Sequence, residues 1–361
     1  MSGRIISDEL FSRVLIEPLS SAQVPDTLRI VSGYATYAMA SHHLIDVRDT
    51  HKKLSVDLVL GMAGADGVRK ADHLGFLSLT NKEEFDFDGS VTCSYVKKPL
   101  SVHSKVYVWC RGDVPLKAFI GSANYSENGF NQKSRIETVA ECDPESAMAF
   151  FLRTKNHAVD CSKVDREKDF PDRLRRLSLP TAPSPVVMIE TDEKSPYKGC
   201  LKIIVSLLIE KGPKKGTVGE GSRLNWGVLS DGSPRRNKKD DPASACRDPN
   251  QAYIALPTPI QKSGFFPQYI RDAKDKNMQP RFTVLTDDGK TFSCVRVSGD
   301  YGKEIETPQD NSELGRYFRQ RLGLPSGAFI TAQDLKRYGR YDVTFYKLDD
   351  ESYLMDFSRP S

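Results

Sequence analysis

The segment SVHSKVYVWCRGDVPLKAFIGSANYSENGF, residues 101–130, contains two apolar runs with polar side chains beside each. His103 and Lys105, separated by one residue, precede the run VYVWC, whereas Ser122 and Asn124 follow the run LKAFIG. Alternate side chains of a strand point to the same face, so we expect His103 and Lys105 to project together. Ser122 and Asn124 are expected on one face at the end of the next strand.

These four side chains suit a substrate that carries an oxyanion. Imidazole can attack phosphorus or transfer a proton near neutral pH. Ammonium, hydroxyl and carboxamide groups can donate hydrogen bonds to phosphoryl oxygens as negative charge develops there. The set contains no carboxylate cluster of the kind that binds Mg²⁺. The pattern therefore indicates phosphate chemistry without a metal ion.

Strand-like apolar runs alternate with helical stretches over the first half of the chain. A helix is expected from near Met39 and another at 144–157. This alternation predicts an α/β layer domain, with an assortment of β-hairpins as the alternative. The strand-like runs are at 28–38, 54–64, 90–98, 104–110, 116–122 and 135–142.

The second half of the chain has a different character. Around 161–185 the sequence is charged and then rich in Pro and Ser, which is typical of a linker. Beyond it short β-like runs dominate, and Asp288-Gly289 predicts a hairpin turn. Helices are expected at 312–322, with Ser312 as N-cap, and at 331–339. Mostly β structure with two short helices favours an open barrel over a sandwich. The predicted organisation is a domain at 1–165, a linker at 166–186 and a domain at 187–361.

Length and composition limit the class of protein. With 361 residues, 39% apolar and 28% charged, the chain is long enough for two globular domains. No run reaches the roughly 18 uncharged apolar residues that cross a bilayer, and the start, MSGRIISDELF, lacks a secretory signal pattern. Seven scattered cysteines without a C-x-x-C pair disfavour a disulfide framework or a zinc site. We therefore expect a cytoplasmic protein with no membrane partner.

The opening segment resembles the signature of the phospholipase D superfamily. That signature is a His-x-Lys followed by Gly-Ser-x-Asn, and RIVSGYAT (29–36) is similar to its first core strand. The resemblance implies that Glu137, in SRIETVAE, matches the acidic residue that supports the histidine in metal-independent nucleases. Cys110 stands where the family often has an Asp, and Asp113 is a poor substitute for it. The matching signature residues are His103, Lys105, Gly121, Ser122 and Asn124.

The mechanism implied by this resemblance needs two histidines. One attacks phosphorus to form a phosphohistidine, and the other protonates the leaving oxygen. Of the other five histidines, only His51 has a lysine two residues later, and no Gly-Ser-x-Asn follows it. We therefore expect a homodimer in which the two His103 side chains face each other across a two-fold axis. A degenerate, inactive half-site is the alternative.

A basic segment in the second half indicates a polyanionic partner, although the net charge of the whole chain is only +4. Residues 211–239 carry eight Lys or Arg against Glu220 and Asp231. Such a loop can follow a phosphate backbone, and Arg and Asn can read guanine and adenine edges. An ordinary solvated loop is the alternative. The candidate DNA-binding residues here are Arg223, Asn225, Trp226, Arg235, Arg236, Asn237 and Lys238.

Residues from about 187 to 361 resemble the B3-like DNA-binding domains attached to certain restriction enzymes. The cues are LNWG followed by AYIALP, the DDGKTF hairpin, and a helix ending in RLGLP before FITAQDLKRYG. The whole chain resembles the NgoFVII-type restriction endonucleases, which combine a phospholipase D-like domain with a B3-like domain. Two arms of a B3-like domain grip the major groove, which implies a second arm at 297–312. Its candidate contacts are Lys303, Gln309 and Asn311. Aromatic residues expected in the core instead are Phe265, Phe266, Tyr317 and Phe318.

These features predict an α/β phospholipase D-like N-terminal domain, with a mixed sheet flanked by helices, and a mostly-β, B3-like open pseudobarrel. The predicted function is that of a homodimeric, cofactor-free, metal-independent and sequence-specific double-stranded DNA endonuclease of a restriction system. One alternative is a DNA-binding regulator with a vestigial catalytic domain. Another is a phospholipase D-type lipid phosphodiesterase, which the basic segment disfavours. The chain has no G-x-x-x-x-G-K-[ST] loop, so any ATP dependence requires a separate helicase-like ATPase subunit.

Overall fold

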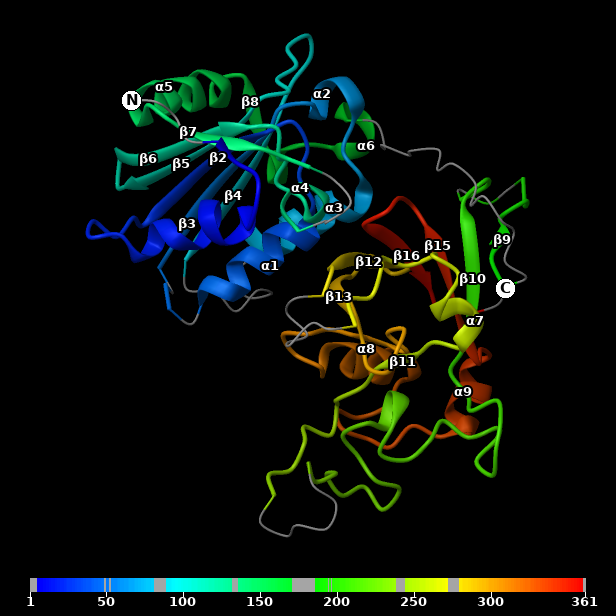
Figure 1. Cartoon of the computed structure of the whole chain (residues 1–361). Helices are drawn as coiled ribbons and strands as arrows, with labels where there is room; N and C mark the ends of the chain where they lie inside the picture. Colours follow the sequence, from blue (N-terminus) through cyan, green and yellow to red (C-terminus); the bar gives the residue numbers. More distant parts are fainter. Residues whose placement is uncertain are drawn as a thin grey trace. The chain divides into compact units, whose positions relative to one another are not determined.

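The chain forms two compact units, Met1–Leu174 and Arg175–Ser361, in the computed structural model (Figure 1). Residues 171–185, most of the predicted linker, lie outside the described part of the chain. Each unit is built around its own eight-stranded sheet. The structure describes residues 5–48, 50–51, 53–80, 89–131, 136–170, 186–193, 195, 197–237, 244–271 and 279–359.

The sheet of the N-terminal unit is mixed, as predicted. Strands β2, β3 and β4 pair in parallel, and the remaining pairs are antiparallel. A parallel pair needs a long crossover connection, and helices supply it in this unit. In spatial order the strands are β1 (Ile5–Ile6), β7 (Val139–Cys142), β6 (Val114–Gly121), β5 (Lys105–Arg111), β2 (Thr27–Ser32), β3 (Ser55–Leu60), β4 (Ser90–Val96) and β8 (Ala158–Asp160).

Helices cover both faces of this sheet, with α5 on one side and α1 and α3 on the other (Figure 1). Along β5, Tyr107 and Trp109 enter the larger apolar core, whereas Val106 and Val108 enter a smaller core beneath α5. The alternation follows from the two-residue period of a strand. The helical segments are η1 (Phe11–Ile16), η2 (Glu17–Ser20), α1 (Tyr37–Arg48), α2 (Ala63–Asp66), α3 (Lys70–Thr80), α4 (Glu127–Phe130), α5 (Pro144–Lys155), η3 (Cys161–Lys163) and α6 (Arg166–Asp169).

The C-terminal unit contains an open and mainly antiparallel sheet, which confirms the open architecture predicted for it. Only β12 and β16 pair in parallel among the described strands, and the outer strands β11 and β9 do not pair with each other. In spatial order the strands are β11 (Ile254–Ala255), β14 (Glu304–Glu306), β13 (Thr291–Val297), β12 (Phe282–Thr286), β16 (Ser352–Asp356), β15 (Asp342–Lys347), β10 (Leu201–Ser206) and β9 (Met188–Ile189).

Local sequence signals set the turns and helix ends of this unit. The hairpin between β12 and β13 turns at Gly289, whose φ of +91° suits glycine. Helix α8 (Glu313–Leu322) follows Ser312 as predicted, but the Ser312 side chain makes no capping hydrogen bond. Helix α9 (Ala332–Tyr338) begins with a capping box between Thr331 and Asp334. The described residues of this unit also form two short helical turns, η4 (Arg223–Asn225) and α7 (Thr258–Gln261).

The four aromatic residues assigned to the core are buried, with exposures of 0–3%. Phe265 and Phe266 pack edge to face, as do Tyr317 and Phe318.

In the part of the chain that the structure describes, no helix combines the length and the apolar character that a membrane span requires.

Replacing Trp109 tests the packing of the N-terminal unit. Its side chain is 0% exposed, and its indole N–H donates to the carbonyl of Val14 at 2.8 Å. We expect Trp109→Ala to lower the free energy of unfolding by about 3–5 kcal/mol, because a large cavity forms and a buried acceptor loses its donor. Urea denaturation measures the change. Leu152→Ala, at a side chain that is 49% exposed on α5, should change it by less than about 0.5 kcal/mol. Equal losses would contradict the packing described.

Candidate active site

His103 and Lys105 lie together at the start of β5, as their spacing predicts. His103 is exposed, whereas Lys105 is only 5% exposed. The Lys105 Nζ lies 3.1 Å from Nδ1 of His103 and donates to the His103 carbonyl at 2.6 Å. Burial lowers the pKa of Lys105, and the negative charge of Glu137 opposes this effect. A buried ammonium therefore lies directly beneath an accessible imidazole.

The register of β5 and β6 brings the two halves of the motif side by side. Lys105 pairs with Gly121, the last residue of β6, so Ser122 and Asn124 follow at the same edge of the sheet. Gly121 is required here because a Cβ at this position would lie 2.1 Å from the carbonyl oxygen of Thr138. Close approach between backbones thus explains the glycine of the Gly-Ser-x-Asn motif.

Asn124 has a fixed orientation. Its Oδ1 accepts a hydrogen bond from the backbone N–H of Tyr34 at 3.0 Å and lies 3.4 Å from the hydroxyl of Ser32. At Gly33 a Cβ would lie 3.2 Å from the His103 ring and 3.3 Å from the Asn124 Oδ1. His103 and Asn124 therefore approach the same backbone position after β2. With its oxygen engaged in this way, the Asn124 amide leaves Nδ2 as the donor that can face a substrate.

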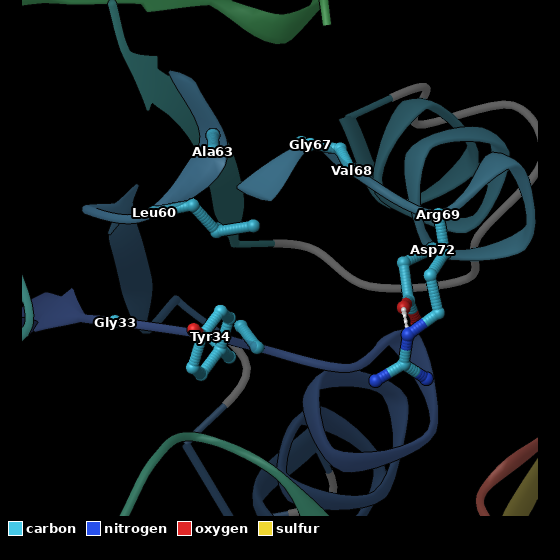
Figure 2. A pocket seen from close by; sticks show the side chains of 9 residues that line it. Gly33, Tyr34, Leu60, Ala63, Gly67, Val68, Arg69 and Asp72 are labelled. Carbon is cyan, nitrogen blue, oxygen red and sulfur yellow. Dashed lines mark ion pairs between the residues drawn. The ribbon is translucent and has the colours of Figure 1, made fainter. Parts of the chain in front are cut away.

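Tyr34 contacts the site but was not predicted as a site residue. Its ring packs edge-on against the His103 ring, with 5.7 Å between centroids and 77° between planes, and its hydroxyl bonds to Asp66. Figure 2 shows Tyr34 beside Gly33 on the wall of a small cavity, opposite Leu60. This cavity has a volume of about 10 Å³, which is room for about one water molecule. In the sequence, SGY (32–34) looked like part of a core strand, and no local signal marked it.

Glu137 contacts Ser122 instead of His103 in the single chain. The Ser122 hydroxyl donates to the Glu137 carboxylate and accepts from the backbone N–H of Thr138 at 3.0 Å. The structure shows no hydrogen bond between the described side chains of Glu137 and His103. The expected support of the histidine by Glu137 is therefore not made within one chain, because Glu137 faces Ser122 across the connection between β6 and β7.

Cys110 lies away from these polar groups, which accounts for the departure at this position. It sits on the opposite face of β5, in the small apolar core beneath α5. Burial raises the pKa of its thiol, so the thiol stays protonated. The nearby guanidinium of Arg29 pairs with Asp113 at 2.7 Å. A charged residue at position 110 is therefore not needed to neutralise Arg29, and its absence leaves the His103 face unchanged.

The other histidines that make hydrogen bonds do so elsewhere in the unit. His42 contacts Glu127 at 2.7 Å, His73 contacts the Tyr95 hydroxyl at 2.9 Å, and His51 contacts the Leu19 carbonyl at 3.2 Å. Burial lowers the pKa of His43 to about 3. None of these contacts reaches His103, so the described part of one chain brings no second imidazole to it.

Asn225, a predicted DNA contact, is buried inside the C-terminal unit at 0% exposure. Its Nδ2 donates to the carbonyls of Gly219 at 2.9 Å and Ile330 at 2.8 Å. Its Oδ1 accepts from the Ile330 N–H at 2.8 Å. Because no polar atom of the side chain remains for a base, this placement contradicts the prediction. Asn225 instead ties the basic loop to the segment before α9.

The other predicted DNA contacts differ in exposure, and their contact with DNA stays a prediction. Lys238 lies outside the described residues. Lys303 is exposed, and its ammonium lies 3.8 Å from the carboxylate of Glu304. Arg236 and Asn237 are also exposed. The half-buried members are Arg223, Trp226, Arg235, Gln309 and Asn311.

Solved structures that are similar to part of the chain include three at low identity. NucT from Helicobacter pylori is 16% identical, with a TM-score of 0.29, and the match covers 44% of this chain and 98% of that one. Nuc from Salmonella typhimurium, a phospholipase D family member, is 18% identical (TM-score 0.31; 44% and 97% covered). Polyphosphate kinase from Porphyromonas gingivalis is 14% identical (TM-score 0.31; 47% and 25% covered). No curated protein sequence matches the chain.

Two domains of one protein family match the chain in succession. Residues 8–168 match the N-terminal PLD domain of the NgoFVII restriction endonuclease, and residues 198–349 match its C-terminal B3-like DNA-binding domain. The first match contains the His103 site, and the second contains the basic loop and the strands of the open sheet from β10 to β15. The chain therefore belongs to the NgoFVII restriction endonuclease family.

Proposed function

We propose that this protein is a sequence-specific double-stranded DNA endonuclease of a restriction system, which hydrolyses phosphodiesters without a metal ion. The observation that carries the proposal is the grouping of His103, Lys105, Ser122 and Asn124 at one sheet edge, in a chain that also has a B3-like DNA-binding domain. The exposed imidazole can attack a phosphodiester, and the neighbouring ammonium, hydroxyl and amide groups can stabilise the charge that develops.

The reaction proceeds in two steps in a homodimer. His103 of one subunit attacks phosphorus, a P–N bond forms, and the P–O bond to the leaving oxygen breaks. The His103 imidazolium of the partner subunit donates its proton to that oxygen. Water then attacks the phosphohistidine, the partner's His103 accepts a proton from this water, and the P–N bond breaks. The two histidines thus return to their starting states.

The remaining polar side chains stabilise the phosphoryl group. The Lys105 ammonium supplies positive charge, and the Asn124 Nδ2 donates a hydrogen bond to an equatorial oxygen. The Ser122 hydroxyl donates to Glu137 in the single chain and turns to the phosphoryl group when Glu137 engages the imidazole. Tyr34 limits the rotation of the His103 ring through its edge-on contact. Glu137 orients the imidazole in the assembled dimer, where the two sites meet.

Two other functions make different predictions. A DNA-binding regulator with a vestigial catalytic domain would bind DNA without cutting it. A lipid phosphodiesterase would use the same chemistry on an interfacial substrate, but the basic loop and the B3-like domain favour DNA. A separate helicase-like ATPase subunit would be needed for ATP dependence. Incubation with plasmid DNA separates the endonuclease from both alternatives, because neither of them would cut the plasmid. Adding ATP shows whether cleavage depends on it.

Replacing His103 tests its role. We expect His103→Ala to reduce plasmid cleavage by about 10³-fold or more, because it removes both the nucleophile and the general acid. DNA binding in a gel-shift assay should remain, since the B3-like domain is unchanged. The matched control is His51→Gln, which alters the other His-x-Lys pair and should cleave at the wild-type rate. A His103→Ala protein that cleaves normally would exclude this mechanism.

Removal of divalent metals tests the proposal that the protein hydrolyses DNA without a metal ion. We expect cleavage in excess EDTA at a rate within about twofold of that in Mg²⁺, because the charge stabilisation comes from Lys105, Ser122 and Asn124. End-point and initial-rate plasmid assays measure this ratio. Cleavage that appears only after Mg²⁺ is restored would show that the proposed site does not act alone.

Mixing subunits tests the shared site. Wild-type protein is unfolded and refolded together with His103→Ala at increasing ratios, and cleavage is measured at constant total protein. If each active site needs both His103 side chains, activity falls with the square of the wild-type fraction. A linear decrease would indicate independent sites and contradict the dimeric mechanism.

A further inference from the structure

The loop that follows β10 holds two arginines side by side. The backbone N–H of Arg235 donates to the carbonyl of Gly227 at 2.8 Å, and the N–H of Arg247 donates to the carbonyl of Arg235 at 2.8 Å. The neighbouring residues Arg236 and Cys246 form an antiparallel bridge. Ladder-type hydrogen bonds therefore hold Arg235 and Arg247 next to each other, although they lie far apart in the loop sequence.

Arg247 is held on an aromatic surface. Its guanidinium lies over the Trp226 ring, with 4.3 Å between Cζ and the ring centroid, and Trp226 packs edge-on against Tyr253 at 5.5 Å. Its Nη1 donates to the Gln251 Oε1 at 2.9 Å. Stacking on a tryptophan orders an arginine at a modest entropic cost and leaves part of the guanidinium free to donate. Arg247 lies outside the basic segment 211–239 and was not a predicted contact.

Arg223 and Arg235 are also held by their surroundings. Arg223 has a φ of +52°, a conformation that is uncommon for a residue other than glycine, and its Nη1 donates to the Leu208 carbonyl at 3.2 Å. It also lines a groove of about 640 Å³. The Arg235 side chain packs over Gly221, where an added Cβ would lie 3.0 Å from the Arg235 Cδ. The backbone N–H of Tyr253 donates to the Arg223 carbonyl at 3.1 Å, which joins the two halves of the loop.

These three arginines form no ion pair with any residue that the structure describes. Among the described residues, no carboxylate lies within 4.0 Å of Arg223, Arg235 or Arg247. Burial and the charge of Arg235 both lower the pKa of Arg247, and Glu306 offsets this only at longer range. In the same unit, other arginines have such partners, in the pairs Arg321–Asp287, Arg337–Asp334 and Arg340–Asp356.

We infer that Arg223, Arg235 and Arg247 form a binding site for the backbone phosphates of duplex DNA, with Trp226 and Tyr253 as its floor. We call these three residues the arginine cluster. Glu210 and Glu306 act on Arg223 and Arg247 only at longer range, without an ion pair. Ordered like charges repel one another, and a polyanion removes that repulsion. Phosphates suit the arginine cluster better than base edges, because a run of phosphates offers several negative charges at once, whereas a base edge offers none. The inference rests on the proposed function, since it takes DNA as the ligand.

The salt dependence of DNA binding tests the arginine cluster. Full-length protein is titrated into a fluorescently labelled duplex of mixed sequence in EDTA over a range of KCl concentrations, and anisotropy gives Kd. A phosphate contact releases counterions, so Arg247→Gln, Arg235→Gln and Arg223→Gln should each reduce the slope of log Kd against log [KCl] by about one. The matched control is Arg337→Gln, at an exposed arginine that pairs with Asp334 at 2.6 Å, and its slope should equal that of the wild type.

Trp226→Leu provides a second variant that leaves the charge unchanged. If the ring orders Arg247, Trp226→Leu should weaken binding, and the double variant with Arg247→Gln should bind no more weakly than Arg247→Gln alone. Melting temperatures equal to that of the wild type show that each variant is folded. For a variant that melts earlier, the slope is measured at a temperature where it remains folded.

Three results would overturn the inference. One is a wild-type slope for Arg247→Gln, and another is an equal loss for Arg337→Gln, which would indicate a general charge effect. The third is a loss that differs between duplexes of equal length and different sequence, which would indicate base reading. The endonuclease proposal is tested separately, by DNA cleavage and not by the salt dependence of binding. Reduced slopes in a protein that never cleaves DNA would support the arginine cluster and refute the endonuclease.

Discussion

The grouping of His103, Lys105, Ser122 and Asn124 depends on the pairing of β5 with β6, which sets Lys105 opposite Gly121. A shift of one residue in this register would turn Lys105 into the small apolar core and send Val106 to the polar face. Gly121 secures the arrangement, because only a residue without Cβ allows the backbone of Thr138 to approach so closely. The same contact brings Glu137 to Ser122. One strand register therefore positions the imidazole, the ammonium, the hydroxyl and the carboxylate together.

A second constraint acts through β2. The backbone after this strand passes between His103 and Asn124, and the N–H of Tyr34 fixes the amide of Asn124. A side chain at Gly33 would press on both residues. The site is thus assembled from three strands whose ends meet, and the Lys105 ammonium and the Asn124 amide are oriented by the chain itself. Such preorganisation is what electrostatic stabilisation of a phosphoryl group requires.

In the C-terminal unit, the residues available for DNA are those that the loop does not need for its own folding. Asn225 has a side chain suited to reading adenine, yet its polar atoms bond to Gly219 and Ile330 and hold the loop closed. Arg247 lies beyond the basic segment but returns to it through the hydrogen bond to Arg235. Asn225 is thus buried and holds the loop together, whereas Arg247 remains partly exposed. The amino-acid type alone does not distinguish these two roles.

The sequence by itself determined the His-x-Lys and Gly-Ser-x-Asn motifs, the hairpin at Gly289 and the two helices that follow it, because these depend on local spacing and backbone preference. The open sheet was indicated by the mostly β composition, and the mixed sheet was implied by the resemblance to the phospholipase D superfamily. The sequence did not reveal the contact of Tyr34 with His103, the pairing of Glu137 with Ser122, the burial of Asn225, or the stacking of Arg247 on Trp226. Those features join segments that are distant along the chain. Their geometry follows from packing and burial, which only the tertiary structure decides.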